Sequence, residues 1–161
     1  MIKIIVMKFG GTSVGNAERI KNVASIIKFH AKKNPIVAVS AVAKVTDMLI
    51  NLADECSEGN GKGTLEQIKS LHYGIIEKLG IGEELLKEDI EELSNLADKI
   101  KYGKRSDAKI LDEVQSFGER MSSKIVAAEL NKTGVNARAF NSWDLGFVTN
   151  SEYCSAETLE T

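Results

Sequence analysis

The feature that most constrains this fold is an apolar strand pattern that ends in two glycines and leads directly into a helical pattern. Residues 2–9 are apolar apart from two lysines, which is typical of a strand covered on both faces in a parallel sheet. Residues 10–15 (GGTSVG) form a glycine-bounded loop, and Asn16 is placed to cap the helix that follows. The apolar residues of that helix recur at helical spacing and are Ile20, Val23, Ala24 and Ile27.

A second strand follows this helix after Pro35, which stops the helical pattern. Residues 36–40 (IVAVS) have the composition of a buried strand, and two parallel strands joined by a helix make a right-handed βαβ unit. The loops that follow the two strands are therefore expected side by side. Residues 45–56 are expected to be helical, and residues 58–63 (EGNGKG) are expected to form a flexible surface loop.

The middle of the chain, residues 58–103, has the pattern of a loop and a helical hairpin inserted into this α/β frame. Residues 64–67 (TLEQ) match a capping box that opens a helix running to Gly80. Residues 83–102 predict a second amphipathic helix that stops at Gly103. Its acidic residues are expected to be solvated, and they are Glu83, Glu84, Glu88, Asp89, Glu91 and Glu92.

The rest of the chain predicts one long helical stretch and two further strands. Ser106 or Asp107 is placed to cap the helix, and a break is expected near residues 117–118, where a glycine interrupts the pattern. Residues 135–140 are a candidate for a third strand, and residues 147–149 for a short fourth one. The 161 residues are enough for one domain or for part of a larger one.

Composition excludes several classes of protein. The net charge of −2, from 21 basic and 23 acidic residues, excludes a basic nucleic-acid-binding protein and requires a local site for any anionic ligand. Cys56 and Cys154 form no CxxC pair, and no cluster of His, Cys and acidic residues has ligand spacing, so neither a disulfide framework nor a protein-only metal site is expected. No apolar run approaches the roughly 20 residues that span a bilayer, so a cytoplasmic protein without a membrane partner is expected.

The strongest chemical signal lies at the end of the first strand. Lys8 stands at the carboxyl end, where α/β proteins place their ligands, and its ammonium suits a phosphoryl group in transfer. Gly10 and Gly11 let the backbone approach a ligand, and free N–H groups in such a turn bind anions. Thr12 and Ser13 add hydroxyl donors. The segment matches neither GxxxxGK[ST] nor GxGxxG, and a tight turn beside a solvated lysine is the alternative interpretation.

Two further segments carry candidate binding residues. Ser40 and Ala41 end the second strand, and Thr46 follows near a helix start. The Thr46 hydroxyl either caps that helix or binds a small polar substrate. Farther along, Glu119 either holds a substrate ammonium, with Arg120 as a local orienting group, or forms an exposed charge pair with Arg120.

At these positions the chain resembles the aspartate kinases, which belong to the amino acid kinase family. Residues 6–15 (VMKFGGTSVG) are similar to their N-terminal signature, and residues 39–41 (VSA) with Thr46 to their second ligand loop. Residues 117–123 (FGERMSS) resemble their FGER segment, and residues 143–149 (WDLGFVT) a looser family pattern. The resemblance covers essentially the whole chain.

This resemblance implies an α/β fold, a three-layer α/β/α sandwich with a mainly parallel sheet, here incomplete on its C-terminal side. The implied reaction transfers the γ-phosphoryl group of ATP to the side-chain carboxylate of L-aspartate and forms 4-phospho-L-aspartate. It opens the biosynthesis of lysine, threonine, methionine and diaminopimelate. The implied cofactor is ATP with Mg²⁺ carried by the nucleotide, and no metal is held by the protein alone.

The resemblance also implies roles for individual residues. Lys8 would stabilise the phosphoryl group in transfer. The residues implied to contact the ATP phosphates are Lys8, Phe9, Gly10, Gly11 and Ser13. The residues implied to bind aspartate are Ser40, Ala41, Thr46 and Glu119.

The chain departs from the family in one important respect. The GRGGSD segment, whose arginine and aspartate serve aspartate binding and catalysis in the family, does not occur here. Residues 1–161 are therefore interpreted as the amino-terminal, substrate-side part of the kinase domain, inactive alone. A homo-oligomer or a chain carrying the missing half is expected as partner, since an incomplete sheet leaves an exposed edge.

Two other functions remain open from the sequence. One is a different kinase of the same fold, acting on glutamate, N-acetylglutamate, a nucleotide or an isoprenoid phosphate. The other is a non-catalytic binding module or one half of a split enzyme. The first is disfavoured by residues 8–15 (KFGGTSVG) and 117–120 (FGER), whereas the lack of a GRGGSD segment favours the second.

Overall fold

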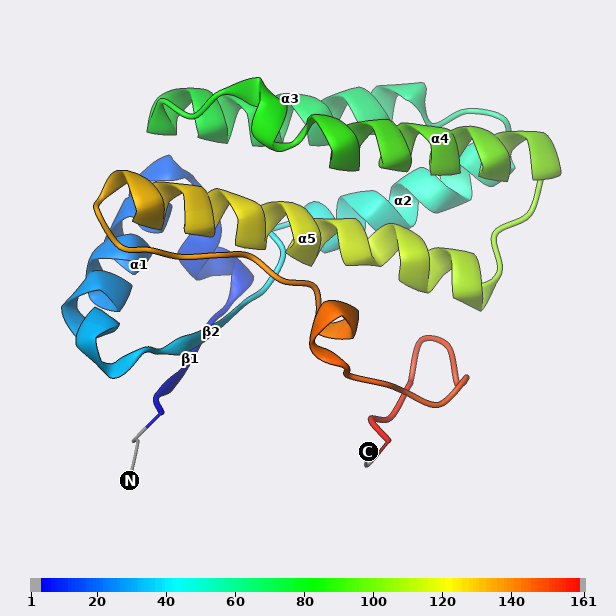
Figure 1. Cartoon of the computed structure of the whole chain (residues 1–161). Coiled ribbons are helices and arrows are strands. Elements are labelled where there is room, and N and C mark those ends of the chain that lie inside the picture. The colour runs from blue at the N-terminus through cyan, green and yellow to red at the C-terminus, as the bar shows by residue number, and fades with distance from the viewer. Residues whose placement is uncertain (1–3, 160–161) are drawn as a thin grey trace.

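The computed structural model describes residues 4–159, which form a two-stranded parallel sheet with helices packed against it (Figure 1). Strand β1 (Val6–Phe9) pairs with β2 (Ile36–Val39), and helix α1 (Ala17–His30) connects them. The predicted parallel βαβ unit is therefore confirmed. The loop that follows β2 contacts α5 through Ser40 and Ala41.

The sheet is covered by helices on one face only. In register, Val6 lies opposite Ile36, and their side chains are 70% and 56% exposed. Phe9 and Val39, at the other end of the ladder, pack against the core. The prediction of a strand covered on both faces is wrong for the described part of β1, because the chain supplies helices for one layer alone; residues 2 and 3 of that prediction lie outside the described residues.

Four further α-helices build the rest of the molecule (Figure 1). They are α2 (Val45–Ser57), α3 (Lys62–Leu79), α4 (Lys87–Gly103) and α5 (Ala108–Lys132). Helix α2 packs against α3, α4 and α5, so it is the element around which the others assemble. Within residues 4–159, no helix is long and apolar enough to cross a membrane. The short 3₁₀ turns are η1 (Gly11–Val14), η2 (Ala31–Lys33), η3 (Glu83–Leu85) and η4 (Ser142–Leu145).

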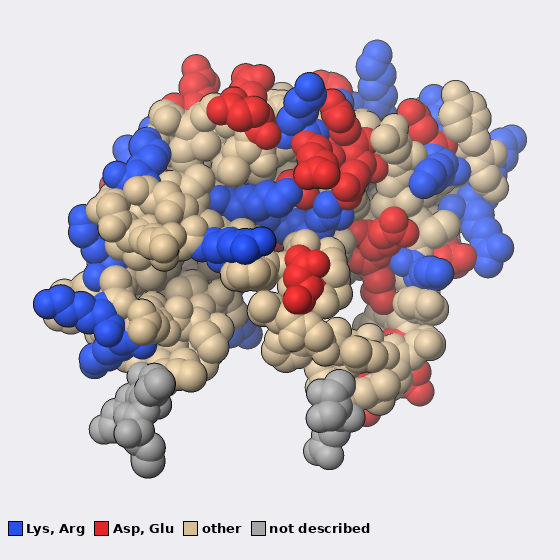
Figure 2. Space-filling view, in the orientation of Figure 1, with Lys and Arg blue, Asp and Glu red and all other residues tan. Residues whose placement is uncertain are grey.

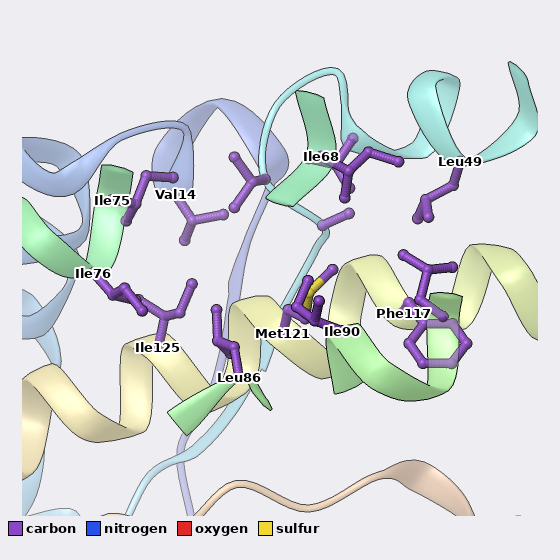
Figure 3. Packing of buried hydrophobic residues seen from close by; sticks show 14 of the residues in the cluster. Val14, Leu49, Ile68, Ile75, Ile76, Leu86, Ile90, Phe117, Met121 and Ile125 are labelled. Atoms are coloured by element: carbon purple, nitrogen blue, oxygen red, sulfur yellow. The ribbon is translucent and has the colours of Figure 1, made fainter. Parts of the chain in front are cut away.

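One hydrophobic core joins the βαβ unit to the helical region. Figure 3 shows Ile68 and Ile76 of α3 in the same cluster as Phe117 and Ile125 of α5, with Val14 of the first loop nearby. All five side chains are buried. The helical hairpin is therefore part of the main core and not a separate appendage, so its packing fixes the position of α5.

Helix α3 begins earlier than the sequence pattern predicts. It starts at Lys62, so the loop expected over residues 58–63 is shorter by two residues. Gly61, with a φ of 93°, provides the left-handed conformation that precedes the helix. Thr64 lies inside the first turn, and its hydroxyl donates a 2.7 Å hydrogen bond to Glu55 Oε2 on α2. The predicted capping box is therefore wrong, because a tertiary contact uses the threonine.

Helix α4 starts later than predicted, and one of its acidic residues is buried. Gly80 follows α3 with a φ of 62°, as predicted. A separate 3₁₀ turn, Glu83–Leu85, comes before α4, which begins only at Lys87 and ends at Gly103. Five of the six acidic residues predicted to be solvated are exposed, but Asp89 is completely buried. The prediction fails for Asp89 because two cations of α5 face it.

Helix α5 is continuous, although a break was expected at its glycine. Asp107 caps it by accepting the Ile110 N–H at 3.0 Å, which decides between the two predicted caps in favour of Asp107 over Ser106. Gly118 lies in the middle of the helix against Ala41, and a Cβ built on Gly118 would approach Ala41 Cβ to 2.6 Å. The glycine therefore allows close packing and does not interrupt the helix.

The two further predicted strands do not form in this chain. Residues 135–140 are extended and alternate between partly buried and exposed positions, but they pair with no described strand. A groove of about 510 Å³ lies between them and β2. Residues 147–149 contribute only one isolated antiparallel bridge, between Thr149 and Thr158. Their patterns are those of strands, but a strand requires a hydrogen-bonded neighbour.

Candidate functional site

The first candidate loop is a compact 3₁₀ turn directly after β1. The Ser13 N–H donates to the Gly10 carbonyl at 2.8 Å and closes the turn. The first N–H groups of such a turn, here those of Gly11 and Thr12, have no acceptor within it and point out of its amino-terminal end. Two backbone donors are therefore available where β1 ends, as an anion-binding loop requires.

The loop after β2 lies directly against this turn. The Ser40 N–H donates to the Phe9 carbonyl at 3.0 Å, which extends the ladder by one residue. A Cβ built on Gly11 would lie 2.7 Å from the Ala41 carbonyl oxygen, so glycine is required at position 11 for this approach. The expectation that the two loops lie side by side is confirmed by these contacts.

Helix α5 brings the third predicted segment to the same place. Glu119 Oε1 accepts a hydrogen bond from the Ala41 N–H at 3.1 Å, across 78 positions of sequence. The Ser122 hydroxyl donates to the Ser40 carbonyl at 2.6 Å. Together with Gly118, which packs on Ala41, these residues hold the second loop to one side of α5.

Lys8 and Thr46 lie at the edges of this arrangement. Lys8 is exposed and stands opposite Ala38 on the face of the sheet that the helices leave uncovered. Thr46 is the second residue of α2 and is also exposed. The position before α2 is taken by Lys44 with a φ of 71°, so Thr46 is not the N-cap residue of this helix. Its hydroxyl therefore remains available to a ligand.

Arg120 turns away from Glu119, which contradicts both its predicted local orienting role and the predicted pair between the two. Its Nη2 lies 3.0 Å from Asp89 Oδ1 and 2.5 Å from Glu92 Oε2, both on α4. The guanidinium also covers the ring of Phe117, with 4.2 Å between Cζ and the ring centroid. Neighbouring helix positions differ in direction by about 100°, so the two side chains necessarily face different partners.

Sequence reasoning missed two charged residues close to the site. Arg19 lines a shallow cavity of about 400 Å³ with Thr12 and Ser13, and its Nη1 donates to the Thr12 carbonyl at 2.6 Å. The sequence signal that could have identified Arg19 is its position in the first turn of the helix that follows the glycine loop. Asp89 was missed although it lies beside Ile90 on the apolar stripe of its helix.

No protein-only metal site is evident around these loops: across residues 4–159, no group of three or more His, Cys, Asp or Glu residues could hold an ion. The fold and the site together define an α/β protein that presents a lysine, a glycine turn and a carboxylate at the carboxyl ends of parallel strands. The model of the amino acid kinase family matches residues 3–161, so the chain belongs to that family.

The relatives that the chain matches include aspartokinases, in agreement with the resemblance seen in the sequence. Aspartokinase 1, chloroplastic, of Arabidopsis thaliana is 35% identical over 160 residues, covering 96% of this chain and 28% of the relative. The crystal structure of E. coli aspartokinase III in complex with aspartate and ADP superposes with a TM-score of 0.85 at 28% identity, over 97% of this chain and 35% of that one. The chain thus spans about a third or less of these relatives.

A second structure of the E. coli enzyme, in complex with lysine and aspartate, gives a TM-score of 0.84 at 28% identity. It covers 96% of this chain and 35% of the other. The two superpositions confirm the predicted α/β fold, of which this chain forms the parallel βαβ unit and the helices on one face.

Proposed function

We propose that this chain forms the substrate-side part of an aspartate kinase. The observation that carries the proposal is the convergence of three segments: the turn at Gly11, the loop at Ala41 and Glu119 of α5. These are the segments whose sequences resemble the aspartate kinases. The relatives named aspartokinases, one of them solved with aspartate and ADP, support the same substrates for this chain.

The proposed phosphate side of the site is the first loop. The N–H groups of Gly11 and Thr12, which have no acceptor within the turn, would bind phosphate oxygens, with the Ser13 hydroxyl and the Arg19 guanidinium in the neighbouring cavity. Lys8 places a mobile positive charge at the carboxyl end of β1, where it stabilises the charge of the phosphoryl group in transfer. Mg²⁺ accompanies the nucleotide, and the protein positions the phosphates.

The proposed aspartate side is built from the second loop and α5. Glu119 uses Oε1 to accept the Ala41 N–H, which leaves Oε2 for the ammonium of the amino acid. The hydroxyl of Thr46 completes this side, and Ser40 and Ala41 shape it through the backbone hydrogen bonds that hold the second loop to β1 and α5. The side-chain carboxylate of aspartate is ionised at neutral pH, so it attacks the γ-phosphorus without a general base. The bond from that phosphorus to ADP breaks as the carboxylate–phosphorus bond forms.

We propose that the chain by itself binds aspartate but does not complete the transfer. The GRGGSD segment of the family, with its arginine and aspartate, is not in the sequence. Incubation with aspartate and MgATP, followed by hydroxylamine trapping of acyl phosphate, is expected to give no product above background. Formation of product would show that residues 1–161 suffice for catalysis and would overturn this part of the proposal.

Calorimetric titration with L-aspartate tests the proposal directly. Glu119→Ala is expected to weaken aspartate binding by about tenfold or more, because a hydrogen bond to a charged group is lost. Glu113→Ala removes an exposed carboxylate from the same helix and is the matched control, with unchanged affinity expected. L-glutamate, one methylene longer, is expected to bind more weakly than L-aspartate.

Three outcomes would contradict the proposal. Tighter binding of glutamate would favour another kinase of the same fold. Equal affinities for Glu119→Ala and the wild type would remove Glu119 from the site. If a folded chain bound neither aspartate nor MgATP, these residues would not form a substrate site in this chain.

The proposed function also suggests a metabolic pathway, a cellular compartment and a protein partner. The product would enter the biosynthesis of lysine, threonine, methionine and diaminopimelate. Cys56 and Cys154 are both free thiols, which supports a reducing compartment, and we propose the cytoplasm. A second copy, or a chain that carries the rest of the domain, is the proposed protein partner.

A further inference from the structure

Asp89 is a completely buried carboxylate that the proposed mechanism does not use. It lies on α4 and faces two cations of α5: Lys124 Nζ is 2.5 Å from Oδ2, and Arg120 Nη2 is 3.0 Å from Oδ1. Only the Lys124 contact has hydrogen-bond geometry, so the Arg120 contact is an ion pair without that alignment. On the surface over these two helices, Figure 2 shows basic side chains directly below an acidic cluster.

The two cations are held more firmly than a surface pair would be. The Arg120 side chain is only 15% exposed, and it is fixed by Asp89, by Glu92 and by the ring of Phe117 beneath its guanidinium. Lys124 lies one helical turn farther along the same face of α5. The face of α5 that carries Arg120 and Lys124 is thereby anchored to α4.

Another face of the same helical turn holds the candidate site. Gly118 packs on Ala41, Glu119 accepts the Ala41 N–H, and Ser122 donates to the Ser40 carbonyl. Since Glu119 and Arg120 are adjacent in one rigid helix, any rotation that moves the Arg120 side chain turns Glu119 by the same angle. The anchoring of Arg120 therefore acts together with the core packing of α5 to set where the Glu119 carboxylate lies.

We propose that Asp89 is a positioning residue for the aspartate site: through Arg120 and Lys124 it fixes the rotation of α5 that places Glu119 on the Ala41 N–H. The part of this inference that concerns aspartate rests on the proposed function, whereas the part that concerns the Glu119–Ala41 contact does not.

The charge of Asp89, and not its volume, carries the effect. Replacing Asp89 by asparagine keeps the shape but leaves two cations without their buried partner, and unpaired charges in such a place turn toward water. Arg120 then keeps Glu92, which is half exposed, as its one acidic partner among the described residues, and α5 loses the ionic part of the restraint on its rotation while its packing in the core remains. The contact between Glu119 and Ala41 is then expected to open more often than the rest of the core.

Amide hydrogen exchange of Ala41, followed by NMR on the whole chain, tests the inference. Asp89→Asn is expected to speed exchange of the Ala41 amide by about tenfold relative to core amides of α2, because the local contact opens separately from global unfolding. Glu119→Ala removes the acceptor and defines the fastest exchange. Glu91→Gln changes an exposed carboxylate on the same helix and is the control expected to leave Ala41 unchanged.

A packing variant separates positioning from a purely structural role. Leu93→Ala removes a buried side chain of α4 that makes no ion pair, so it lowers stability without touching the charges. Equal Ala41 exchange in Asp89→Asn and Leu93→Ala, compared at equal global stability, would overturn the inference. If Asp89→Asn does not fold, Arg120→Lys replaces it as the test, because lysine keeps the positive charge but lacks the planar guanidinium. This variant is expected to show a smaller increase in the exchange rate of the Ala41 amide. No increase would also overturn the inference.

Calorimetric titration of the same variants with aspartate tests whether Asp89 affects binding at the proposed site. Asp89→Asn is expected to weaken aspartate binding severalfold, with Glu91→Gln unchanged. If the wild type bound no aspartate, the proposed function would fail, but the exchange of the Ala41 amide would still decide the positioning role of Asp89. If the wild type bound aspartate and Asp89→Asn bound it equally well, the link from Asp89 to the site would be refuted.

Discussion

Gly118 and Gly74 are both glycines inside helices, but only the surroundings of Gly118 require one. A Cβ on Gly118 would lie 2.6 Å from Ala41 Cβ and 3.4 Å from Leu49 Cδ1, whereas a Cβ on Gly74 meets no atom within 4 Å. Alanine gains about 1 kcal/mol over glycine in a helix, and forced overpacking costs about 1–3 kcal/mol. The two positions therefore give opposite predictions for the same substitution.

Gly118→Ala is expected to lower the free energy of unfolding by about 1–2 kcal/mol, because overpacking against Ala41 exceeds the gain in helix propensity. Gly74→Ala is expected to raise it by about 0.5–1 kcal/mol. Urea denaturation of the two variants beside the wild type measures both changes. A stabilised Gly118→Ala variant would show that α5 and the second loop are not in close contact.

His72 predicts a pH dependence of stability. It is completely buried on α3, and its Nδ1–H donates to the Ile68 carbonyl at 2.8 Å, while Nε2 has no partner. Burial lowers the pKa of His72, and the hydrogen bond to Ile68 and the charge of Asp89 oppose this shift only in part. A histidine with a lowered folded-state pKa binds its proton more readily in the unfolded chain, so its contribution is lost as the pH falls below about 6.5.

The expected result is a free energy of unfolding that decreases from pH 7 to pH 5, measured by urea denaturation at each pH. His72→Leu replaces the imidazole by an apolar side chain of similar size, and the stability of this variant is expected to vary less over this pH range. An equally steep decrease in His72→Leu would assign the pH dependence to other groups.

At the scale of elements, the start of α5 shows how a cap can be chosen between neighbours. The sequence offers Ser106 and Asp107, and both residue types cap helices well. Only Asp107 lies where its carboxylate reaches the Ile110 N–H. Which residue caps the helix depends on where the backbone changes from the extended to the helical conformation. The local sequence pattern defines that point only to within a residue or two.

Asp107→Ala is therefore expected to lower the free energy of unfolding by about 1 kcal/mol, since one amide at the helix start loses its acceptor. Ser106→Ala is the neighbouring control, with a change near zero expected. Thermal unfolding followed by circular dichroism measures both. The reverse order of effects would place the start of α5 one residue earlier.

At the scale of the molecule, the uncovered face of the sheet is the most unusual feature. Val6 and Ile36 face each other there with exposed side chains, beside Lys8 and the unpaired edges of a two-stranded sheet. Exposed apolar faces and open sheet edges both favour association. This face is the natural position for a second layer of structure, whether from another chain or from more of the same domain.

The double substitution Val6→Thr with Ile36→Thr is expected to reduce self-association of the chain, because threonine keeps the strand preference and replaces apolar surface. Sedimentation velocity over a range of concentrations measures it, and the unfolding temperature of the variant is expected to stay close to that of the wild type. Unchanged association would show that this face is not the one through which copies meet.

The sequence by itself determined the βαβ unit, the helix over most of each predicted range and the three segments that converge at the candidate site. Local signals were enough: apolar runs mark β1 and β2, Asn16 and Gly80 mark helix ends, and the glycines after the first strand mark the turn at Gly11–Val14. Parallel pairing then placed the two loops together, because the carboxyl ends of neighbouring parallel strands meet at one edge.

Only the tertiary structure decided how the remaining residues are used. Thr64 binds Glu55 on another helix, Gly118 admits Ala41 instead of breaking α5, and Asp89 is buried because Arg120 and Lys124 face it. Residues 135–140 have a strand pattern but no strand beside them. In each case the outcome depends on whether another element supplies a partner, because hydrogen bonds, ion pairs and close packing between elements are not specified by a local pattern.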